Sequence, residues 1–312
     1  MAITDFSVII PVYNEEANIQ LIYNRLTSVM TELNLKYELI FINDGSKDNT
    51  LALVKALATK HEYVKYIDFS RNFGHQIAVS AGIDSAMGET ICIIDADLQD
   101  PPELIIDMYQ KILEGNDVVY AKRKKRAGDF PPKVWAAKVF YRLLAKMTSF
   151  PIPVDTGDFR LISRQIVDVL KQMPEKSKYL RGQIAWIGFK QTYVEFDRDP
   201  RYGGKSNYTF RKLLKLALDG ITGFSDIPLK IVTYFGLVVS VFAFIMSLYV
   251  LWGRFISNNY VPAGWASTII SVLFIGGIQM IGIGIIGEYI SRMNHDLRNR
   301  PLYIIKESNI KN

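Results

Sequence analysis

Three aspartates crowd one short stretch of the chain, Ile91 to Glu103, which reads ICIIDADLQDPPE. Its first residues are apolar or β-branched, a pattern typical of a strand that is buried on both faces. Asp95, Asp97 and Asp100 then follow at the carboxyl end of that strand. In an open α/β sheet, ligands bind in the crevice outside the carboxyl ends of the strands. The stretch therefore predicts a binding site.

The two aspartates nearest the strand predict a metal ion in this site. Side chains alternate along a strand, so Asp95 and Asp97 are expected to point the same way, and two close carboxylates repel unless a cation lies between them. Mg²⁺ or Mn²⁺ binds through one or two carboxylates together with substrate phosphate oxygens, which suits a nucleoside diphosphate. Gln99 offers an amide oxygen as a further ligand. The alternative is a solvated acidic turn before a helix, with Pro101 and Pro102 near its first turn.

Strands and helices alternate in the part of the chain before this stretch. Compact apolar runs at Phe6–Val12, Glu38–Ile42 and Val64–Phe69 predict strands, and a segment with helical spacing follows each of them. This alternation is typical of a parallel, doubly wound α/β sheet. Glu15 follows the first strand and Asp44 the second, so these acids are expected to face the same crevice. No Gly-rich turn follows the first strand, which excludes a Rossmann dinucleotide site.

The composition indicates a membrane protein. Of its 312 residues, 49% are hydrophobic and 22% charged, too apolar a balance for a purely soluble enzyme. The excess lies in Ile231–Gly253 and Trp265–Gly287, two uncharged runs of about 23 residues that we expect to span the membrane. A pair of buried core helices is the alternative. Lys and Arg are concentrated on the outer flanks of the two runs, so the positive-inside rule places both termini in the cytoplasm.

The remaining compositional features fit a cytoplasmic face resting on lipid. The formal net charge is +6 and no nucleic-acid motif accompanies it, which favours anionic lipid over nucleic acid as the partner. Cys92 is the only cysteine, so no intrachain disulfide can form, as is usual in a reducing compartment. The N-terminus lacks the basic start and long apolar core of a secretory signal.

Five motifs in order along the chain resemble one known family. They are PVYNEE at 11–16, NDGSKDNT at 43–50, DADLQDPPE at 95–103, TGDFRL at 156–161 and RYGGKSNY at 201–208. Together they look like family 2 glycosyltransferases of the polyprenyl-phosphate type, the group of the dolichyl-phosphate mannose synthases and bactoprenol glucosyltransferases. The resemblance covers essentially the whole chain, including NFGHQ at 72–76 and the two C-terminal spans. It implies a GT-A fold and an inverting reaction. The family's second motif usually reads Asp-Asp-Gly-Ser, and Asn43 replaces its first aspartate here.

The resemblance also implies roles for individual residues of the donor site. The nucleotide pocket would be formed by Pro11, Tyr13, Glu15 and Asp44, and the metal and diphosphate would be held by Asp95, Asp97 and Gln99. Arg201 and Lys205 would add positive charge at the phosphates, unless their segment is only a flexible basic loop beside lipid headgroups.

Other matching positions concern the acceptor. Asp158 matches the family's candidate base, yet a polyprenyl phosphate is already largely anionic at neutral pH, so an orienting role or a turn role stays open. The acceptor phosphate would be held by cations from Arg123, Arg126, Arg142 and Arg160. A solvated basic face is the alternative reading of the run KRKKR at 122–126.

These observations predict an organisation and a function. We expect a cytoplasmic GT-A domain at 1–209, interfacial amphipathic helices at 210–230, two transmembrane helices at 231–287 with an external loop at 254–264, and a cytoplasmic basic tail at 288–312. The predicted reaction transfers one hexose, most simply glucose from UDP-glucose, to undecaprenyl or another polyprenyl phosphate at the cytoplasmic face of the plasma membrane. The resemblance further implies a homo-oligomer, a tetramer or a dimer.

Several alternatives to this function stay open. GDP-mannose, UDP-N-acetylglucosamine or a UDP-aminoarabinose derivative could replace UDP-glucose, because sugar selectivity depends on pocket shape. An alternative that is not an enzyme is a membrane protein that binds nucleotide sugars or aids lipid flipping. A processive polysaccharide synthase is disfavoured, since its usual Gln-x-x-Arg-Trp is absent from the QIAW sequence at 183–186.

Overall fold

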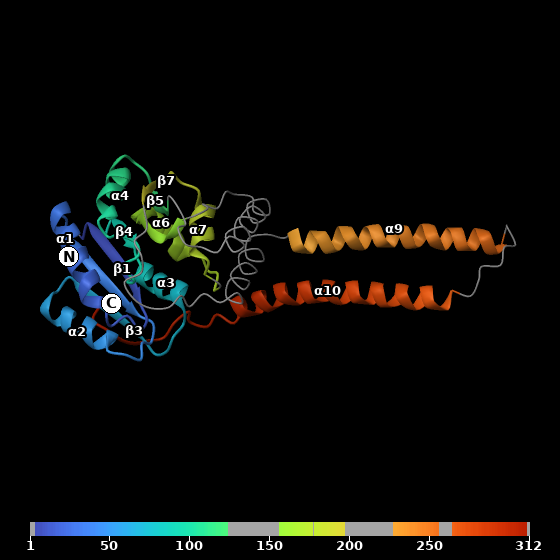
Figure 1. Ribbon diagram of the computed structural model, residues 1–312, viewed down its shortest axis with the longest axis horizontal. Helices are drawn as coiled ribbons and strands as arrows, with labels where there is room; N and C mark the ends of the chain where they lie inside the picture. The colour runs from blue at the N-terminus through green and yellow to red at the C-terminus, as the bar shows by residue number, and fades with distance from the viewer. Residues whose placement is uncertain (1–3, 124–155, 177, 197–226, 256–263, 311–312) are drawn as a thin grey trace. The chain divides into compact units, whose positions relative to one another are not determined.

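The computed structural model describes residues 4–123, 156–176, 178–196, 227–255 and 264–310 (Figure 1). The chain divides into two compact units, one made of residues 1–217 together with 300–312 and the other of residues 218–299. The expected interfacial helices at 210–230 and the loop at 254–264 lie largely outside the described residues.

An eight-stranded mixed sheet forms the core of the first unit, in the order β7-β5-β6-β4-β1-β2-β3-β8. The strands β4, β1, β2 and β3 run parallel to one another. Strand β6 is antiparallel to β4, and β8 is antiparallel to β3. The expected α/β class with a mostly parallel sheet is confirmed. The strands are β1 (Phe6–Val12), β2 (Tyr37–Asn43), β3 (Val64–Phe69), β4 (Thr90–Ile93), β5 (Val118–Arg123), β6 (Thr156–Ser163), β7 (Gln191–Phe196) and β8 (Ile305–Ser308).

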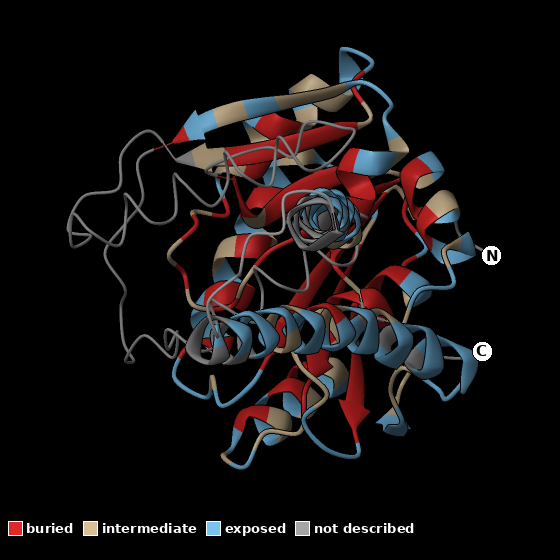
Figure 2. Ribbon diagram, turned by 90° about the vertical axis from the view of Figure 1, so that its right-hand side faces the viewer, coloured by how far each residue is buried: buried red, intermediate tan, exposed pale blue. Residues whose placement is uncertain are grey.

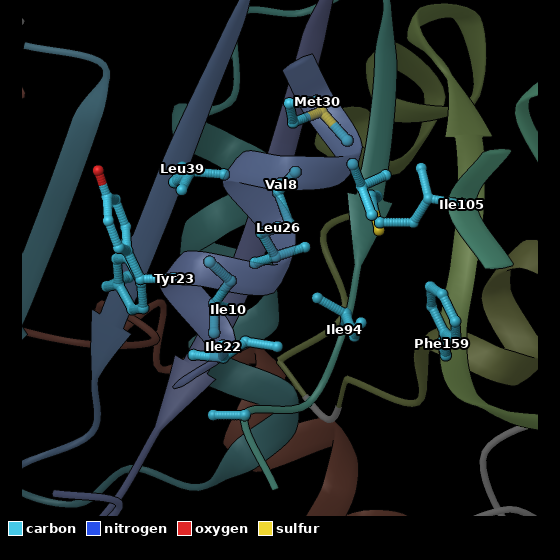
Figure 3. Close-up of a cluster of buried hydrophobic side chains, with 14 of the residues drawn as sticks. Val8, Ile10, Ile22, Tyr23, Leu26, Met30, Leu39, Ile94, Ile105 and Phe159 are labelled. Carbon is cyan, nitrogen blue, oxygen red and sulfur yellow. The ribbon is translucent and has the colours of Figure 1, made fainter. Parts of the chain in front are cut away.

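Helices cover both faces of this sheet, and each face has its own apolar core. Residues of β1 alternate between the two cores, with Val8 and Ile10 on one face and Ile9 on the other, as expected for a strand buried on both sides. Buried strands are visible between the helices in Figure 2. Figure 3 shows Ile22 and Leu26 of α1 lying over Val8 and Ile10. The first face carries α1 (Ile19–Leu33), α2 (Thr50–Lys60) and α4 (Leu104–Leu113), and the second α3 (His75–Ser85), α6 (Arg164–Gln172) and α7 (Leu180–Ile187).

The bounds of most N-terminal elements agree with the sequence pattern, but the aspartate-rich stretch differs. The strand expected to reach Asp95 ends at Ile93. A loop follows in which Leu98 has a φ of 57°, a left-handed conformation that few non-glycine residues adopt. Asp95 and Asp97 are therefore loop residues, and strand alternation does not fix the direction of their side chains.

The C-terminal part of the chain, where a basic tail at 288–312 was expected, contains a strand of the sheet. Residues 300–312 belong to the first unit, and β8 pairs with β3 as the edge strand of the sheet. Lys55 forms an ion pair with Glu307 of β8 at 2.5 Å. The tail therefore closes the edge of the sheet beside β3, and an edge strand with mostly exposed residues carries little apolar signal in the sequence.

The second unit is a pair of helices, α9 (Ile227–Phe255) and α10 (Trp265–Leu297). They lie side by side, and a Cβ at Gly282 of α10 would approach Val232 of α9 to 3.0 Å (Figure 1). Many large apolar side chains on both helices are exposed, for example Phe244 at 66% and Met280 at 68%. Among the described residues, one helix is long and apolar enough to cross a membrane, through Phe274–Ser291, while α9 offers the shorter apolar stretch Leu229–Val239. Two membrane-spanning helices therefore stay a prediction.

Candidate functional site

The pairing of β4 with β6 brings the predicted donor and acceptor residues together. The strands are antiparallel, with Thr90 opposite Ser163 and Ile93 opposite Arg160. Continuing this register beyond the end of β4 places Asp95 opposite Asp158 near the start of β6. The carboxyl end of the parallel strand and the amino end of the antiparallel strand thus share one edge of the sheet, where a ligand crevice is expected.

His75 bridges these two aspartates. Its Nε2 atom lies 3.6 Å from Oδ1 of Asp95 and 3.4 Å from Oδ2 of Asp158. Burial lowers the pKa of His75, but the charge of Asp95 and the contact with Asp158 outweigh it and raise the pKa to about 9. The imidazole is therefore charged at neutral pH, and its side chain is 40% exposed, so it can also meet a ligand.

Asp158 is the centre of a partly buried ion-pair network. Its Oδ1 accepts hydrogen bonds from Nη2 of Arg160 at 2.9 Å and from Nε of Arg181, on α7, at 3.0 Å. Burial raises the pKa of Asp158, but Arg181, His75 and Arg160 together hold it well below its usual range. A carboxylate so strongly ion-paired is a weak proton acceptor and a good anchor for cations.

Arg160 is the most deeply buried member of this network. Its side chain is 1% exposed, and it donates to the carbonyl oxygens of Gly157 and Asp158 as well as to the Asp158 carboxylate. Its Nη1 is buried and has no hydrogen-bond partner among the described residues. The guanidinium therefore faces the protein interior. Its contacts favour a role in orienting Asp158 over the expected role in binding an acceptor phosphate.

Asp95 and Asp97 have the properties of cation ligands. Oδ1 of Asp95 is buried and makes no hydrogen bond with the described residues. Burial raises the pKa of Asp95 to about 6, with His75 opposing the shift and Asp158 and Asp97 adding to it. Oδ1 of Asp97 accepts a hydrogen bond from the backbone N–H of Gln99 at 3.1 Å.

Within the described part of the chain, no group of three or more His, Cys, Asp or Glu side chains lies close enough to hold a metal ion alone. Mg²⁺ usually binds through one or two protein carboxylates and completes its shell with phosphate oxygens and water. The two carboxylates of Asp95 and Asp97 and the amide oxygen of Gln99 are suitable ligands for a metal ion that binds together with a nucleoside diphosphate.

Asp44 holds the loop that connects β3 to α3. Its carboxylate accepts hydrogen bonds from the backbone N–H groups of Phe73 at 2.6 Å and Gly74 at 3.0 Å, and the residue is 4% exposed. Burial raises the pKa of Asp44, while these two hydrogen bonds and the charge of His75 lower it. Asp44 thus fixes the loop that ends at His75.

Gly45 allows the loop to approach this closely. Its φ is +68°, and a Cβ there would lie 2.6 Å from the backbone carbon of Arg71 and 2.7 Å from the backbone nitrogen of Asn72. Both the conformation and the space therefore require glycine.

We expect Gly45→Ala to displace the loop and weaken binding of the nucleotide. The added methyl group meets backbone, which cannot move aside alone, so destabilisation of about 1–3 kcal/mol is expected. Calorimetric UDP binding and thermal unfolding would measure the two effects. Gly115→Ala is a matched control, since Gly115 also has a positive φ (81°) but open space around its Cβ position. Equal UDP affinity for the two variants would contradict a role for the close approach.

The other residues expected in the nucleotide pocket lie at or just beyond the carboxyl end of β1. Pro11 is buried within β1, opposite Ile42. Tyr13 is 41% exposed just beyond the strand, where its ring can meet a base. Glu15 accepts a hydrogen bond from Asn18 at 2.6 Å, at the start of α1. Tyr13 is thus the side chain of the three that is best placed to contact a ligand.

Several predicted cationic residues cannot be placed. Arg126, Arg142, Arg201 and Lys205 lie outside the described residues, and Arg123 is described only as the last backbone position of β5.

The sequence analysis did not assign His75 or Arg181 to the site. His75 lies in the NFGHQ motif, and the position of this motif after the third strand was the available signal. Arg181 belongs to no recognisable motif, and it contacts Asp158 from the first turn of α7.

Comparison with known proteins points to one family. The description "Glycosyl transferase family 2" matches residues 7–170, and "GtrB C-terminal hairpin" matches residues 227–293. YkcC of Bacillus subtilis, named as an uncharacterized glycosyltransferase, is 48% identical over 97% of this chain and 94% of its own. The prophage bactoprenol glucosyl transferase homolog of Escherichia coli is 43% identical over 96% of this chain and 98% of its own.

Among the solved structures that are similar is the glucosyl-3-phosphoglycerate synthase of Mycobacterium tuberculosis, in complex with Mn²⁺, UDP-glucose and phosphoglyceric acid. It is 19% identical, covers 70% of this chain and 78% of its own, and has a TM-score of 0.47.

Proposed function

The chain belongs to glycosyltransferase family 2, and from this premise we propose that it transfers glucose from UDP-glucose to a polyprenyl phosphate with inversion at the anomeric carbon. The observation that carries the proposal is the cluster of Asp95, His75 and Asp158. In this cluster, a carboxylate that could bind the metal ion of the nucleotide sugar lies beside a cation that could bind the acceptor phosphate. The names of the relatives, bactoprenol glucosyl transferases, support glucose as the sugar and a polyprenyl lipid as the acceptor.

Asp95 and Asp97 would hold Mg²⁺ or Mn²⁺ together with the donor diphosphate, with Gln99 as a further ligand. Such an ion neutralises the negative charge that develops on the departing nucleoside diphosphate. The buried Oδ1 of Asp95, which makes no hydrogen bond with the described residues, supports this role. Tyr13 and the loop fixed by Asp44 would border the nucleotide, and Arg201 and Lys205 would add charge at the phosphates.

The acceptor attacks without losing a proton to the protein. A phosphate monoester carries a charge between −1.5 and −2 at neutral pH, so an oxygen is already available as the nucleophile. That oxygen forms a bond to the anomeric carbon on the face opposite the diphosphate, and the electron pair of the breaking carbon–oxygen bond leaves with the nucleoside diphosphate. No general base is needed, in agreement with the low pKa of Asp158.

Asp158 would instead position the cations that receive the acceptor. His75 and Arg181 both contact its carboxylate, and their side chains are 40% and 24% exposed, so both can reach a phosphate in the crevice. Buried Arg160 holds the carboxylate from the protein side. Preorganised charges of this kind stabilise a transition state without reorganisation cost.

The fold supports the prediction of two membrane-spanning helices. Strand β8 follows α10 in the chain and pairs with β3, which precedes α9. Because both strands belong to one sheet, they lie on the same side of any membrane, and the segment between them crosses an even number of times. Two crossings, with the sheet and both termini on the cytoplasmic side of the plasma membrane, agree with the charge distribution.

Cysteine labelling in intact cells tests this topology. The native Cys92 is buried, so it gives a low background with a membrane-impermeant maleimide. We expect Asn259→Cys, in the predicted external loop, to be labelled in intact cells, and Lys60→Cys, at an exposed position of α2, to be labelled only after lysis. Protection of both positions would contradict the two crossings.

The experiment that tests the function is sugar transfer by the purified full chain in detergent. UDP-glucose, UDP-galactose, UDP-N-acetylglucosamine, GDP-mannose and a UDP-aminoarabinose derivative are offered in turn with undecaprenyl phosphate. Labelled lipid from UDP-glucose alone is the expected result, and labelled lipid from another donor would change the sugar while keeping the reaction. A dimer or tetramer stays a prediction that size determination of the same sample checks.

A further inference from the structure

The loop Ser70–Gly74, between β3 and α3, carries two parts of the proposed site. The backbone N–H groups of Phe73 and Gly74 donate to Asp44, and the next residue is His75, which contacts Asp95 and Asp158. The position of this loop therefore sets the position of the imidazole and of the Asp44 carboxylate.

The C-terminal segment Leu302–Ile310 contacts this loop directly. The backbone N–H of Ser70 donates to the carbonyl oxygen of Ile304 at 3.0 Å. The ring of Tyr303 stacks on Phe69, with centroids 5.1 Å apart and an angle of 19°, and Phe69 meets Phe73 edge to face at 5.6 Å and 85°. A continuous row of three rings thus runs from the C-terminal segment into the loop.

The C-terminal segment is itself fixed at points away from the loop. The hydroxyl of Tyr303 donates to Oδ2 of Asp84, near the end of α3, at 3.1 Å. The side chain of Asn309 accepts from the N–H of Tyr66 at 2.7 Å and donates to the carbonyl of Val64 at 3.0 Å. Tyr303 is therefore a fixed support and not a loose contact.

A second support of the loop is Gly45. The backbone of Arg71 and Asn72 lies against Gly45, where no Cβ fits. Gly45 and the ring row therefore both contact the loop. Removing either support is expected to loosen it.

From this arrangement we propose that Tyr303 is a positioning residue of the donor site and that the C-terminal segment completes this site. The inference rests on the proposed function, which it deepens. One support of the loop Ser70–Gly74 therefore comes from residues that follow α9 and α10 in the chain.

Four variants of the full-length protein test the proposal. Tyr303→Ala removes the ring, and Tyr303→Leu keeps much of its volume in case the alanine variant does not fold. Tyr303→Phe keeps the ring and loses only the hydrogen bond to Asp84. Asn309→Ala is the matched control, because it weakens the same segment at the far end of β3 and contacts no residue of the loop.

Two readouts are taken from each variant in detergent. Donor KM and kcat are measured at saturating undecaprenyl phosphate, and amide hydrogen exchange is followed by mass spectrometry over residues 70–76. We expect the alanine and leucine variants to raise donor KM about fivefold to tenfold, the size of effect that loss of one stacked ring pair allows. Exchange at 70–76 should accelerate in these two variants and stay at the wild-type rate in Tyr303→Phe and Asn309→Ala.

A merely structural role would give a different pattern. If Tyr303→Ala and Asn309→Ala lowered the melting temperature alike and left donor KM and exchange at 70–76 unchanged, the proposal would be overturned. Exchange needs no sugar transfer, so the proposal can be decided even if the wild-type protein transfers no sugar to lipid. In that case the proposed function is wrong, and hydrogen exchange at 70–76 alone decides whether Tyr303 positions the loop.

Discussion

Asp158→Asn is expected to lower kcat by about 10²- to 10³-fold, the usual cost of losing one preorganised charge in an active site. The reason is loss of the carboxylate that orients His75 and Arg181, which lie 3.4 Å and 3.0 Å from its oxygens. Because no proton is removed from the acceptor in this account, raising the pH should not restore the activity of the variant.

The choice of asparagine follows from burial. Asp158→Ala would leave the charged Arg160, 1% exposed, without its partner, at a cost of about 3–5 kcal/mol of unfolding free energy. Asparagine keeps one oxygen for Arg160. Asp117→Asn is the matched control, since Asp117 accepts from Ser163 at the opposite end of β6 and should leave kcat unchanged. Wild-type kcat in Asp158→Asn would contradict the role given to this carboxylate.

Asp97→Asn and Asp95→Asn are expected to reduce transfer by about 10²-fold or more and to raise the Mn²⁺ concentration needed for half-maximal rate. Each substitution removes a negative charge from the proposed ion and its diphosphate. Asp95→Asn also removes the partner of His75, 3.6 Å away, so it should have the larger effect on kcat.

The measurement is a Mn²⁺ titration of the transfer rate, paired with Mn²⁺ binding in the presence of UDP. Asp107→Asn serves as control, because Asp107 lies in the first turn of α4 and is exposed. Half-maximal rates at the same Mn²⁺ concentration in Asp97→Asn and wild type would remove Asp97 from the metal site.

Local sequence patterns predicted the framework of the site well. The run FSVIIPV gives β1 with its observed bounds, Phe6–Val12, because a strand buried on both faces is apolar at consecutive positions. Asp95 and Asp158 were each recognised in their own motif. Their nearness required the antiparallel pairing of β4 with β6, which no short-range pattern contains.

The features that were missed depend on contacts between distant parts of the chain. Arg181 becomes a site residue through packing of α7, and strand β8, with the sequence IKES, lacks apolar alternation because three of its four residues are exposed. For this reason the sequence predicted only a basic tail at 288–312. Its pairing with β3 places Tyr303 beside the loop that ends at His75.

The most direct test of the central claim compares two acceptors that differ only in the phosphate. The purified full chain is given radiolabelled UDP-glucose and Mn²⁺ with either undecaprenyl phosphate or undecaprenol. The account predicts labelled lipid from the phosphate alone, lost on chelation of the metal and regained when Mn²⁺ is added back. Label that appears only as free glucose, or equally in both lipids, would contradict transfer to a lipid phosphate.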